Sequence, residues 1–300
     1  MASIGFIGLG HMGFPMAVNL MKAGHSLSAF DIQTDVLERF SALGGKPALN
    51  IAEAVENQSI IITMLQTGPQ VAEVCLGSAG VFAHAAPGSL YIDSSTIDVE
   101  TSRRLHEAAN RHKLASVDAP VSGGVTGAIE ASLTFMIGGL EEACNRAEPI
   151  LAAMGKKQIR TGGPGSGQAA KICNNMILGV SMVAISEAFL LAEALGLSAE
   201  KLFEVVNSSS GQCWAMSHYP PVQGLISNAP ANHQYQPGFA SKMMLKDLRL
   251  SQKAAGFASV ETPLAAQATD LYEAFCGHGL GHLDFSAIIQ TLTKKSVHDT

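Results

Sequence analysis

A lysine and an asparagine four residues apart give this chain its clearest candidate for acid–base chemistry. Lys171 and Asn175 lie in the run 168–175, Gln-Ala-Ala-Lys-Ile-Cys-Asn-Asn, which begins a long apolar segment with helical spacing. Residues four apart share one helix face. Near a buried helix N-terminus a lysine loses hydration and meets the positive end of the helix dipole, and both effects lower the pKa of its amine. We therefore predict that Lys171 moves a proton and that Asn175 orients the reacting hydroxyl or holds the lysine.

A glycine pattern near the N-terminus predicts a phosphate-binding turn. Gly8, Gly10 and Gly13 follow a strand-like run, 3–7, and open a helix-like run, 13–22. The first glycine permits the bend, the second lets backbone N–H groups approach a pyrophosphate, and the third lets helix and strand pack closely. The helix N-terminus adds unpaired N–H groups and a positive dipole end. The predicted cofactor-binding residues of this turn are Gly8, Leu9, Gly10, His11, Met12 and Gly13.

An acid at the end of the next strand-like run, 26–30, indicates which dinucleotide binds. A carboxylate at Asp31 can accept hydrogen bonds from the adenosine ribose hydroxyls, whereas it repels a 2′-phosphate. Neither Ile32 nor Gln33 supplies the arginine that favours a 2′-phosphate. The pattern therefore favours NAD over NADP.

Three further segments stand where later strand-like runs end, which is the edge at which an open α/β sheet binds ligands. Met64-Leu65-Gln66 can place its backbone along a cofactor, and Ser94-Ser95-Thr96 offers hydroxyls near the nicotinamide side. In the run 118–124, Ser122 is followed by Gly123 and Gly124, and backbone N–H groups exposed there suit a substrate carboxylate. Each segment alone has the composition of an ordinary turn. Their joint placement is what predicts a site.

Aromatic and charged residues further along the chain leave alternatives open. Trp214 and Tyr219 follow the run 209–211, Ser-Ser-Gly, in what we expect to be a loop between helices. They are either packing residues or a lid over a small apolar substituent of the substrate. Lys246 and Asp247 form a basic–acidic pair on a predicted helix, and by themselves they indicate a solvated face.

Strand-like runs alternate with helical runs in the first half, a pattern typical of a parallel sheet covered by helices on both faces. The predicted strands are Ser3–Ile7, Ser26–Phe30, Ser59–Met64, Ser89–Asp93, Ala115–Asp118, Leu133–Ile137 and Gln158–Thr161. The predicted helices among them are Gly13–Lys22, Asp98–Arg111 and Glu141–Met154. We therefore expect an α/β domain in this half of the chain.

A breaker-rich run, Gly-Gly-Pro-Gly-Ser-Gly at 162–167, predicts the domain boundary. We place the first domain at 1–163 and the second at 164–300. Beyond the boundary, 168–195 has helical spacing without a strong breaker except Gly179, and the rest shows helical pieces without period-two strands. The second domain is therefore predicted to be all helical.

Bulk composition excludes several classes of protein. The chain of 300 residues is 47% hydrophobic and 15% charged, which is typical of a well-packed globular protein. A net charge of −6 argues against nucleic acid as a partner. The five cysteines show no Cys-x-x-Cys pair and the N-terminus shows no signal pattern, so we expect free thiols, no metal site and a cytoplasmic location. The apolar run 172–194 contains Asn174, Asn175 and Glu187, so we expect it to be buried in protein rather than in a membrane.

Taken together, these motifs resemble β-hydroxyacid dehydrogenases and look closest to 3-hydroxyisobutyrate dehydrogenases. The likeness runs from Gly5 to Ser286 and includes four motifs in the family's order, at 118–124, 167–175, 209–214 and 246–248. It implies a Rossmann-type α/β N-terminal domain and an all-α C-terminal domain joined by a long interdomain helix, with the active site in the cleft between the two domains. By this similarity Lys171 is the catalytic lysine and Asn175 assists it.

The resemblance also implies roles for the other candidates. Residues that bind the substrate would be Ser122, Gly123, Gly124, Asn175, Trp214, Tyr219 and Asp247. Residues that line the cofactor, beside the glycine-rich turn and Asp31, would be Met64, Leu65, Gln66, Thr96 and Lys246. One position departs from the family's pattern, because a proline often follows the Met-Leu pair where this chain has Gln66.

The implied activity is NAD-dependent oxidation of a small β-hydroxy acid, with 3-hydroxyisobutyrate going to methylmalonate semialdehyde as the first choice. L-serine oxidation and reduction of tartronate or succinic semialdehyde are alternatives within the class. A dinucleotide-binding sensor without turnover is the alternative from another class, and the intact Lys171 and Asn175 argue against it. The apolar surface of the helical domain exceeds what one monomer would cover, which predicts a homodimer or homotetramer.

Overall fold

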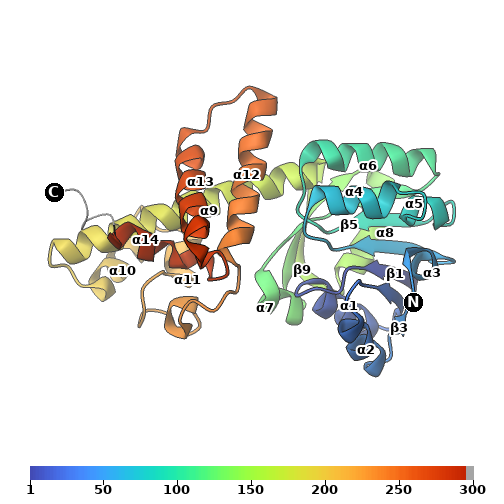
Figure 1. The fold of residues 1–300 in the computed structure, drawn as a ribbon, viewed down its shortest axis with the longest axis horizontal. Coiled ribbons are helices and arrows are strands. Elements are labelled where there is room, and N and C mark those ends of the chain that lie inside the picture. The colour runs from blue at the N-terminus through green and yellow to red at the C-terminus, as the bar shows by residue number, and fades with distance from the viewer. Residues whose placement is uncertain (295–300) are drawn as a thin grey trace. The chain divides into compact units, whose positions relative to one another are not determined.

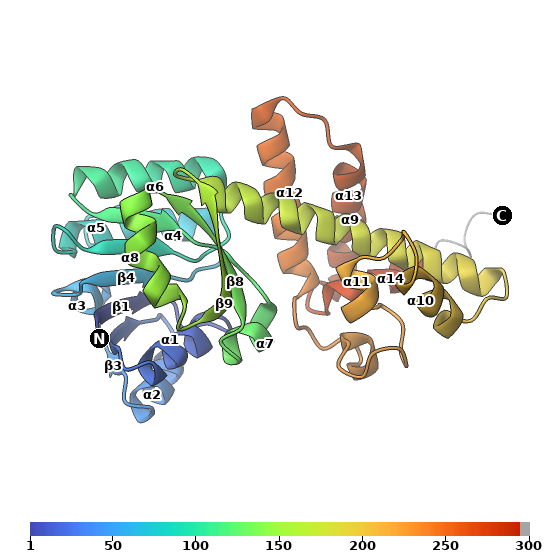
Figure 2. The same ribbon diagram turned by 180° about the vertical axis from the view of Figure 1, so that it is seen from behind.

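The structure is a computed structural model that describes residues 1–294 of the chain. The chain forms two compact units, Met1–Lys171 and Ile172–Thr300, so the division falls inside one long helix, α9 (Ser166–Ala194). The predicted boundary after residue 163 lies in the loop just before that helix, and residues 295–300 of the predicted second domain lie outside the described residues. Figures 1 and 2 show the chain from opposite sides.

A nine-stranded sheet forms the centre of the first unit. Its strands lie in the order β3-β2-β1-β4-β5-β6-β8-β7, and β9 pairs with β8. The strands from β3 to β6 are parallel to their neighbours, whereas β8 is antiparallel to both β6 and β7. The bounds are β1 Ser3–Ile7, β2 Ser26–Phe30, β3 Lys46–Pro47, β4 Ile60–Thr63, β5 Leu90–Asp93, β6 Ala115–Asp118, β7 Val121–Ser122, β8 Leu133–Gly139 and β9 Gly155–Gly162.

Successive side chains on a strand point to opposite faces, and this alternation divides the core of the first unit in two. Phe6 and Ile62 belong to a core with α1, α2, α7 and α8, whereas Ile7 and Ile61 belong to a core with α3, α4, α5 and α6. Figures 1 and 2 show helices on both faces of the sheet. The bounds are α1 Gly13–Lys22, α2 Thr34–Ala42, α3 Ile51–Val55, α4 Gly68–Leu76, α5 Val81–His84, α6 Val99–Arg111, α7 Gly124–Ile129 and α8 Glu141–Leu151.

The sheet is mixed, which corrects the prediction of a parallel sheet at one edge. Strand β8 runs back against β6 because the segment 119–132 between them holds only β7 and the short α7, and β7 pairs directly with β8. A parallel return requires a crossover long enough to span the sheet, usually a full helix. All seven predicted strands are present, but the sequence pattern does not predict β3 and β7, whose two residues show no period. It also misses five short helices, which are α2, α3, α4, α5 and α7.

The second unit is helical, as the sequence predicts. Its core packs α9 against α12 and α13, with Tyr272 and Phe285 among the buried aromatic residues. Helix α9 approaches α12 closely at Gly179, where a methyl group would lie 2.9 Å from Leu248 Cδ2. The bounds are α10 Ala199–Asn207, α11 Trp214–His218, η1 Pro230–His233, α12 Ser241–Ala258, α13 Pro263–Phe275, η2 Cys276–Leu280, η3 Phe285–Ile288 and α14 Ile289–Lys294.

Helix α9 contains the most apolar stretch of the chain. Within residues 1–294 it is the one helix long and apolar enough, by length and composition alone, to cross a membrane, and 44% of its most apolar window is buried inside the protein. Two polar side chains on it are bonded inside the protein, since Ser186 Oγ donates to the Met182 carbonyl at 2.7 Å and Asn175 Nδ2 donates to Asp247 of α12. Met182 and Phe189 join the core of the second unit. The helix therefore contributes one side to a protein core.

A buried acid, Asp93, ends strand β5 in the centre of the sheet. Its Oδ1 accepts hydrogen bonds from Thr63 Oγ1 at 2.8 Å and from the Ser95 N–H at 3.1 Å, while Oδ2 has no hydrogen-bond partner among the described residues. Burial raises the pKa of Asp93 to about 6, although the bonds from Ser95 and Thr63 oppose this and the Asp118 carboxylate adds to it. The folded protein therefore favours the neutral form of Asp93 more strongly than the unfolded chain does.

The raised pKa makes Asp93 a source of pH-dependent stability. The pKa is about 3.9 in the unfolded chain and about 6 in the folded protein, so the stabilisation that Asp93 contributes is complete below about pH 4 and is lost as the pH rises through 6. Asp93→Asn, the uncharged isostere, removes this loss. We expect the unfolding free energy of the variant minus that of the wild type to rise by about 2–3 kcal/mol between pH 4 and pH 7.

Urea-induced unfolding at a series of pH values measures this difference. Asp35→Asn, which removes an exposed carboxylate on α2, is the matched control for the loss of one negative charge. A difference between Asp93→Asn and the wild type that stays constant from pH 4 to pH 7 would show that folding does not raise the pKa of Asp93.

Candidate active site

The glycine-rich turn joins β1 to α1, and its glycines are required by close backbone approaches. Gly8 has a φ of +97°, and a methyl group there would lie 2.4 Å from the Met64 carbonyl oxygen. A methyl group at Gly13 would lie 1.9 Å from the Gly8 carbonyl oxygen, so no side chain fits where α1 begins. At Gly10, by contrast, a methyl group would meet no heavy atom within 4 Å. The turn is therefore compact on its protein side and open at Gly10, which fits a pyrophosphate.

The start of α1 is also suited to an anion. Met12 occupies its N-cap position and offers no oxygen to the first N–H groups of the helix. These N–H groups and the positive end of the helix dipole favour a phosphate. His11 is exposed beside them. The residues present thus fit a dinucleotide, whose phosphates the turn 8–13 would hold.

Asp31 follows β2 and is tied to the glycine-rich turn. Its Oδ2 accepts a hydrogen bond from the Leu9 N–H at 2.6 Å, and its Oδ1 accepts one from the Gln33 N–H at 2.9 Å. Each carboxylate oxygen can accept more than one hydrogen bond, so both keep capacity for ribose hydroxyls. Ile32 is exposed next to it, and its side chain carries no positive charge. The acid is therefore held against the turn.

The loops that follow β4 and β5 are joined to each other. The Leu65 N–H donates to Ser95 Oγ at 2.9 Å, and the Leu65 side chain lies against Gly8. Gln66 is exposed and Thr96 is half-buried, and both make further contacts within the protein. The structure thus brings together three predicted segments, 8–13, 64–66 and 94–96, along one edge of the sheet, where the carboxyl ends of parallel strands meet.

The first turn of α9 is fixed to this edge by Gln168, which is fully buried. Its Oε1 accepts from the Ile97 N–H at 3.0 Å, and its Nε2 donates to the Ser95 carbonyl at 2.8 Å. Lys171 follows on the same helix, three residues later, and is 7% exposed. The contacts of Gln168 therefore hold the turn that carries Lys171 to the loop after β5.

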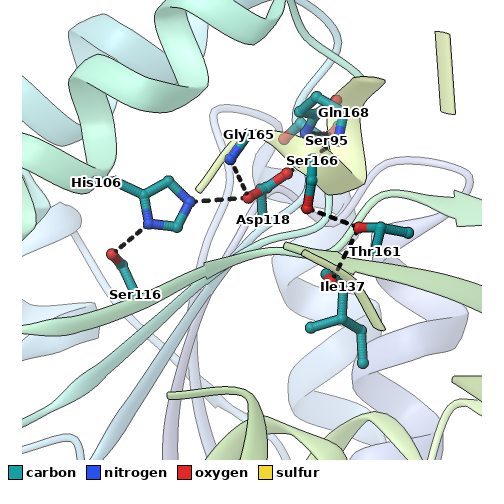
Figure 3. Close-up of polar contacts among 9 residues, drawn as sticks. All are labelled: Ser95, His106, Ser116, Asp118, Ile137, Thr161, Gly165, Ser166 and Gln168. Carbon is teal, nitrogen blue, oxygen red and sulfur yellow. Dashed lines mark hydrogen bonds and ion pairs between the residues drawn. The ribbon is translucent and has the colours of Figure 1, made fainter. Parts of the chain in front are cut away.

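Asp118, at the end of β6, accepts hydrogen bonds from the start of α9 (Figure 3). Its Oδ1 accepts from the Gly165 N–H at 2.8 Å, and its Oδ2 accepts from the Gln168 N–H at 2.9 Å. His106 Nε2 lies 2.9 Å from Oδ1, and His106 Nδ1 lies 2.7 Å from Ser116 Oγ. A carboxylate oxygen can only accept, so the histidine donates to Asp118 from Nε2.

Two glycines allow this close packing of α9 on the sheet. A methyl group at Gly138 would lie 2.6 Å from Asp118 Oδ1, and one at Gly167 would lie 2.4 Å from the Met136 carbonyl oxygen. Both distances are too short for a real Cβ, so the helix start and the two strands could not approach with larger residues. Thr161, on β9, has its Oγ1 2.9 Å from Ser166 Oγ at the start of α9 (Figure 3).

In the second unit Asn175 is part of a polar cluster with α12. Asn175 Nδ2 donates to Asp247 Oδ2 at 2.5 Å, and Lys246 Nζ lies 3.0 Å from Asp247 Oδ1. Asn175 and Asp247 are almost fully buried. The predicted solvated face at 246–247 is therefore wrong for Asp247, whose carboxylate is covered because it bonds to α9. Asn175 stands one turn after Lys171 on that helix.

The run 122–124 forms the turn from β7 into α7. Ser122 is half-buried and pairs with Thr134 of β8. Gly123 has a φ of +133° and Gly124 a φ of +62°, a region that glycine adopts without strain. Other residues would be strained there, so the glycines of this motif are explained by backbone conformation. Their contact with a carboxylate stays a prediction.

Trp214 and Tyr219 lie on and just after a short helix, α11, rather than in the expected loop. Their rings stack with centroids 5.3 Å apart, and Tyr219 also stacks on Phe285 at 5.3 Å. The Tyr219 hydroxyl donates to Asp284 Oδ2 at 2.8 Å, so Tyr219 has a packing role. Trp214 also stacks on His218, with ring centroids 6.1 Å apart, and is half-exposed. The indole is therefore accessible, whereas the phenol is engaged.

Sequence reasoning missed Asp118, His106 and Gln168 as members of this site. The signal that could have found Asp118 is the start of α9, where Gly165 precedes Ser166 and no acid stands in the first turn. A helix that begins without its own capping acceptor requires one from elsewhere. An acid at the end of a neighbouring strand supplies it.

Two family models match the chain. One, the NAD binding domain of 6-phosphogluconate dehydrogenase, matches residues 3–163, and the other, described as NAD-binding of NADP-dependent 3-hydroxyisobutyrate dehydrogenase, matches residues 165–292. A probable 3-hydroxyisobutyrate dehydrogenase from Mycobacterium tuberculosis is 45% identical over 296 residues, which cover 99% of each chain. The chain belongs to the 3-hydroxyisobutyrate dehydrogenase family. The resemblance stated from the sequence is thereby confirmed.

One further relative and one solved structure are also similar to this chain over nearly its whole length. An NAD-dependent L-serine dehydrogenase from Pseudomonas aeruginosa is 42% identical over 288 residues, which cover 96% of this chain and 97% of the relative. The structure of Mycobacterium tuberculosis 3-hydroxyisobutyrate dehydrogenase with L-serine superposes with a TM-score of 0.93 at 45% identity, covering 97% of this chain and 99% of that one. The protein is thus an NAD(P)-dependent, 3-hydroxyisobutyrate dehydrogenase-like enzyme.

Proposed function

We propose that this dehydrogenase oxidises a small β-hydroxy acid with NAD, that 3-hydroxyisobutyrate is its leading substrate, and that Lys171 is the general acid/base. The observation that carries the proposal is the burial of Lys171 in a turn that Gln168 ties to the loop after β5. A lysine removed from water at that edge of the sheet is suited to exchange a proton in a dehydrated site.

Oxidation of the alcohol breaks two bonds to hydrogen. The carbinol carbon gives up a hydride, its hydroxyl gives up a proton, and a carbonyl group forms. NAD, held by the turn 8–13 and Asp31, would supply the acceptor for that hydride. In our proposal the neutral Nζ of Lys171 accepts the hydroxyl proton and becomes an ammonium. Asn175, held by Asp247, orients the hydroxyl or the lysine.

The substrate carboxylate is assigned to the turn after β7. The Ser122 hydroxyl and the backbone N–H groups of Gly123 and Gly124 would bind it, and Tyr219 would position Trp214 over the methyl group of 3-hydroxyisobutyrate. L-serine is the second candidate, because a relative of similar identity is named an L-serine dehydrogenase and the superposed structure contains L-serine. L-serine carries an amino group where 3-hydroxyisobutyrate carries the methyl.

A panel of hydroxy acids tests the activity and the substrate together. With NAD and purified protein, we expect NADH formation with a kcat/KM for 3-hydroxyisobutyrate about tenfold above that for L-serine, since the methyl group can be buried against the indole at no cost, whereas the charged amino group of L-serine must give up water there. The methyl ester should be a poor substrate, and Trp214→Ala should raise KM more for 3-hydroxyisobutyrate than for L-serine. A higher kcat/KM for L-serine would favour the second candidate, and no turnover of either would refute both.

Cofactor preference follows from Asp31. Its carboxylate is fixed beside the glycine-rich turn and repels a 2′-phosphate, so kcat/KM with NAD should exceed that with NADP by about tenfold or more, equivalent to about 1.4 kcal/mol. Replacing Asp31 with Ser and Ile32 with Arg should lower the ratio of kcat/KM with NAD to kcat/KM with NADP. Initial rates over a range of both cofactors measure it, and equal or better use of NADP would overturn the assignment.

Lys171 is tested by two substitutions that differ in what they keep. Lys171→Ala removes the amine, and Lys171→Arg keeps the charge but cannot readily give up its proton. Because removing a general base costs about 10²–10⁴ in rate, we expect both to lose most of kcat while NAD affinity, measured by calorimetry, stays near that of the wild type. Substantial kcat in Lys171→Arg would point to electrostatic anchoring and would exclude Lys171 as the base.

We also propose a homodimer or homotetramer in solution. Apolar side chains on α9, α10, α12 and α13 are exposed, among them Ile177, Leu191, Val205, Phe257 and Leu264. Such residues gather where subunits pack. Light scattering after size exclusion measures the mass, and a monomer would refute this proposal. The cytoplasmic location stays a prediction, which subcellular fractionation tests.

A further inference from the structure

Asp118 is a buried carboxylate that takes no part in the proton transfer proposed for Lys171 and Asn175. It is the first residue of the run 118–124, whose serine and glycines are the proposed carboxylate site, and it is 1% exposed. It accepts one hydrogen bond from His106 and two from α9 and the loop before it (Figure 3). Two of its three partners therefore belong to the segment that leads to Lys171.

Helix α9 depends on Asp118 for its N-terminal cap. The residue just before it is Gly165, which has no side chain, and the hydroxyl of its first residue, Ser166, is paired with Thr161. The first turn carries no acid of its own. A carboxylate at the N-terminus of a helix satisfies orphan N–H groups and is favoured by the dipole. Asp118 supplies this cap from β6, across the sheet edge.

The cap also determines where the following residues lie. Gln168 donates its N–H to Asp118 and uses its amide group to bind the loop 94–97. Lys171 is less than one turn further along the same helix. A shift of the helix start would therefore break the contacts of Gln168 and move the amine of Lys171 away from the loop after β5. Misplacement of a catalytic group by about 1 Å can cost about 10²-fold in rate.

We propose that Asp118 is a positioning residue for the proton transfer: it holds the first turn of α9 against the sheet and thereby sets the place of Lys171. It acts through the helix and not on the substrate. His106, bonded to Ser116 and Asp118, orients the carboxylate for its two backbone donors. This inference rests on the proposed function, in which Lys171 is the base.

Two kinds of substitution test it. Asp118→Asn keeps the shape but replaces one acceptor oxygen with an amide that faces a backbone donor. Gly167→Ala leaves every polar group in place, but its methyl group would lie 2.6 Å from the Asp118 carbonyl oxygen and push the helix start outward. Gly163→Ala is the matched control in the same loop, because a methyl group there meets no heavy atom within 4 Å. His106→Ala gives a milder variant.

Three measurements are made on each purified variant. Hydrogen–deuterium exchange of the peptide covering 163–171 reports on the helix start, calorimetry gives NAD affinity, and steady-state kinetics gives kcat. In Asp118→Asn and Gly167→Ala we expect exchange to accelerate by about tenfold or more, kcat to fall by about tenfold or more, and NAD affinity to stay within about threefold of the wild type. His106→Ala should show smaller changes of the same kind, and Gly163→Ala should match the wild type.

The outcomes separate this proposal from the proposed function. If Lys171→Arg is inactive while Asp118→Asn and Gly167→Ala keep the kcat of the wild type, Asp118 is not a positioning residue and the function stands. If kcat falls without faster exchange, or if NAD affinity falls with it, Asp118 acts in another way and the proposal is wrong. Full activity in Lys171→Arg refutes the proposed function and this inference with it. Should Asp118→Asn not fold, Gly167→Ala and His106→Ala decide.

Discussion

The contact of Asp118 with the start of α9 is the constraint on which the arrangement of the first unit depends. A buried carboxylate is costly unless it is hydrogen-bonded, and here two backbone N–H groups and a histidine satisfy it. The same bonds satisfy donors of a long helix that lacks a cap of its own. Burial of the Asp118 carboxylate would be unfavourable without these N–H groups, and burial of the N–H groups would be unfavourable without the carboxylate. The helix start, and Lys171 with it, is therefore tied to the end of one particular strand.

Glycine makes this contact and the phosphate-binding turn possible for the same physical reason. At Gly13 and Gly8, and at Gly167 and Asp118, one backbone approaches another so closely that a methyl group would collide with it. Both approaches bring a helix N-terminus to the carboxyl edge of the sheet, where N–H groups and dipole face an anion. At α1 the anion would be the pyrophosphate of the cofactor, and at α9 it is a side chain of the protein. A helix N-terminus that meets an anion thus serves cofactor binding at α1 and positioning of Lys171 at α9 in our proposals.

A buried polar network connects β4, β5 and α4 next to the loops that follow β4 and β5. Asp93 accepts from Thr63, Thr63 is bonded to the Tyr91 hydroxyl, and that hydroxyl accepts from Cys75. Burial raises the pKa of Cys75 and of Tyr91, so both stay neutral at physiological pH. Such networks specify a unique arrangement when every member is satisfied. The exception is Asp93 Oδ2, which has no hydrogen-bond partner among the described residues, and burial of this acid raises its pKa to about 6.

The sequence by itself determined seven of the nine strands, the three longest helices of the first unit before α9, and the glycine-rich turn with Asp31, because periodicity and turn chemistry are local properties. It did not determine that β8 runs antiparallel to β6, since two-residue β7 carries no period and its pairing is non-local. Nor did it show that Asp118 and Gln168 hold α9, or that Asp247 is buried against Asn175. These contacts join residues 47 to 72 positions apart. Only the tertiary structure decides them, because the energy of a buried hydrogen bond depends on which strand end and helix turn the fold brings together.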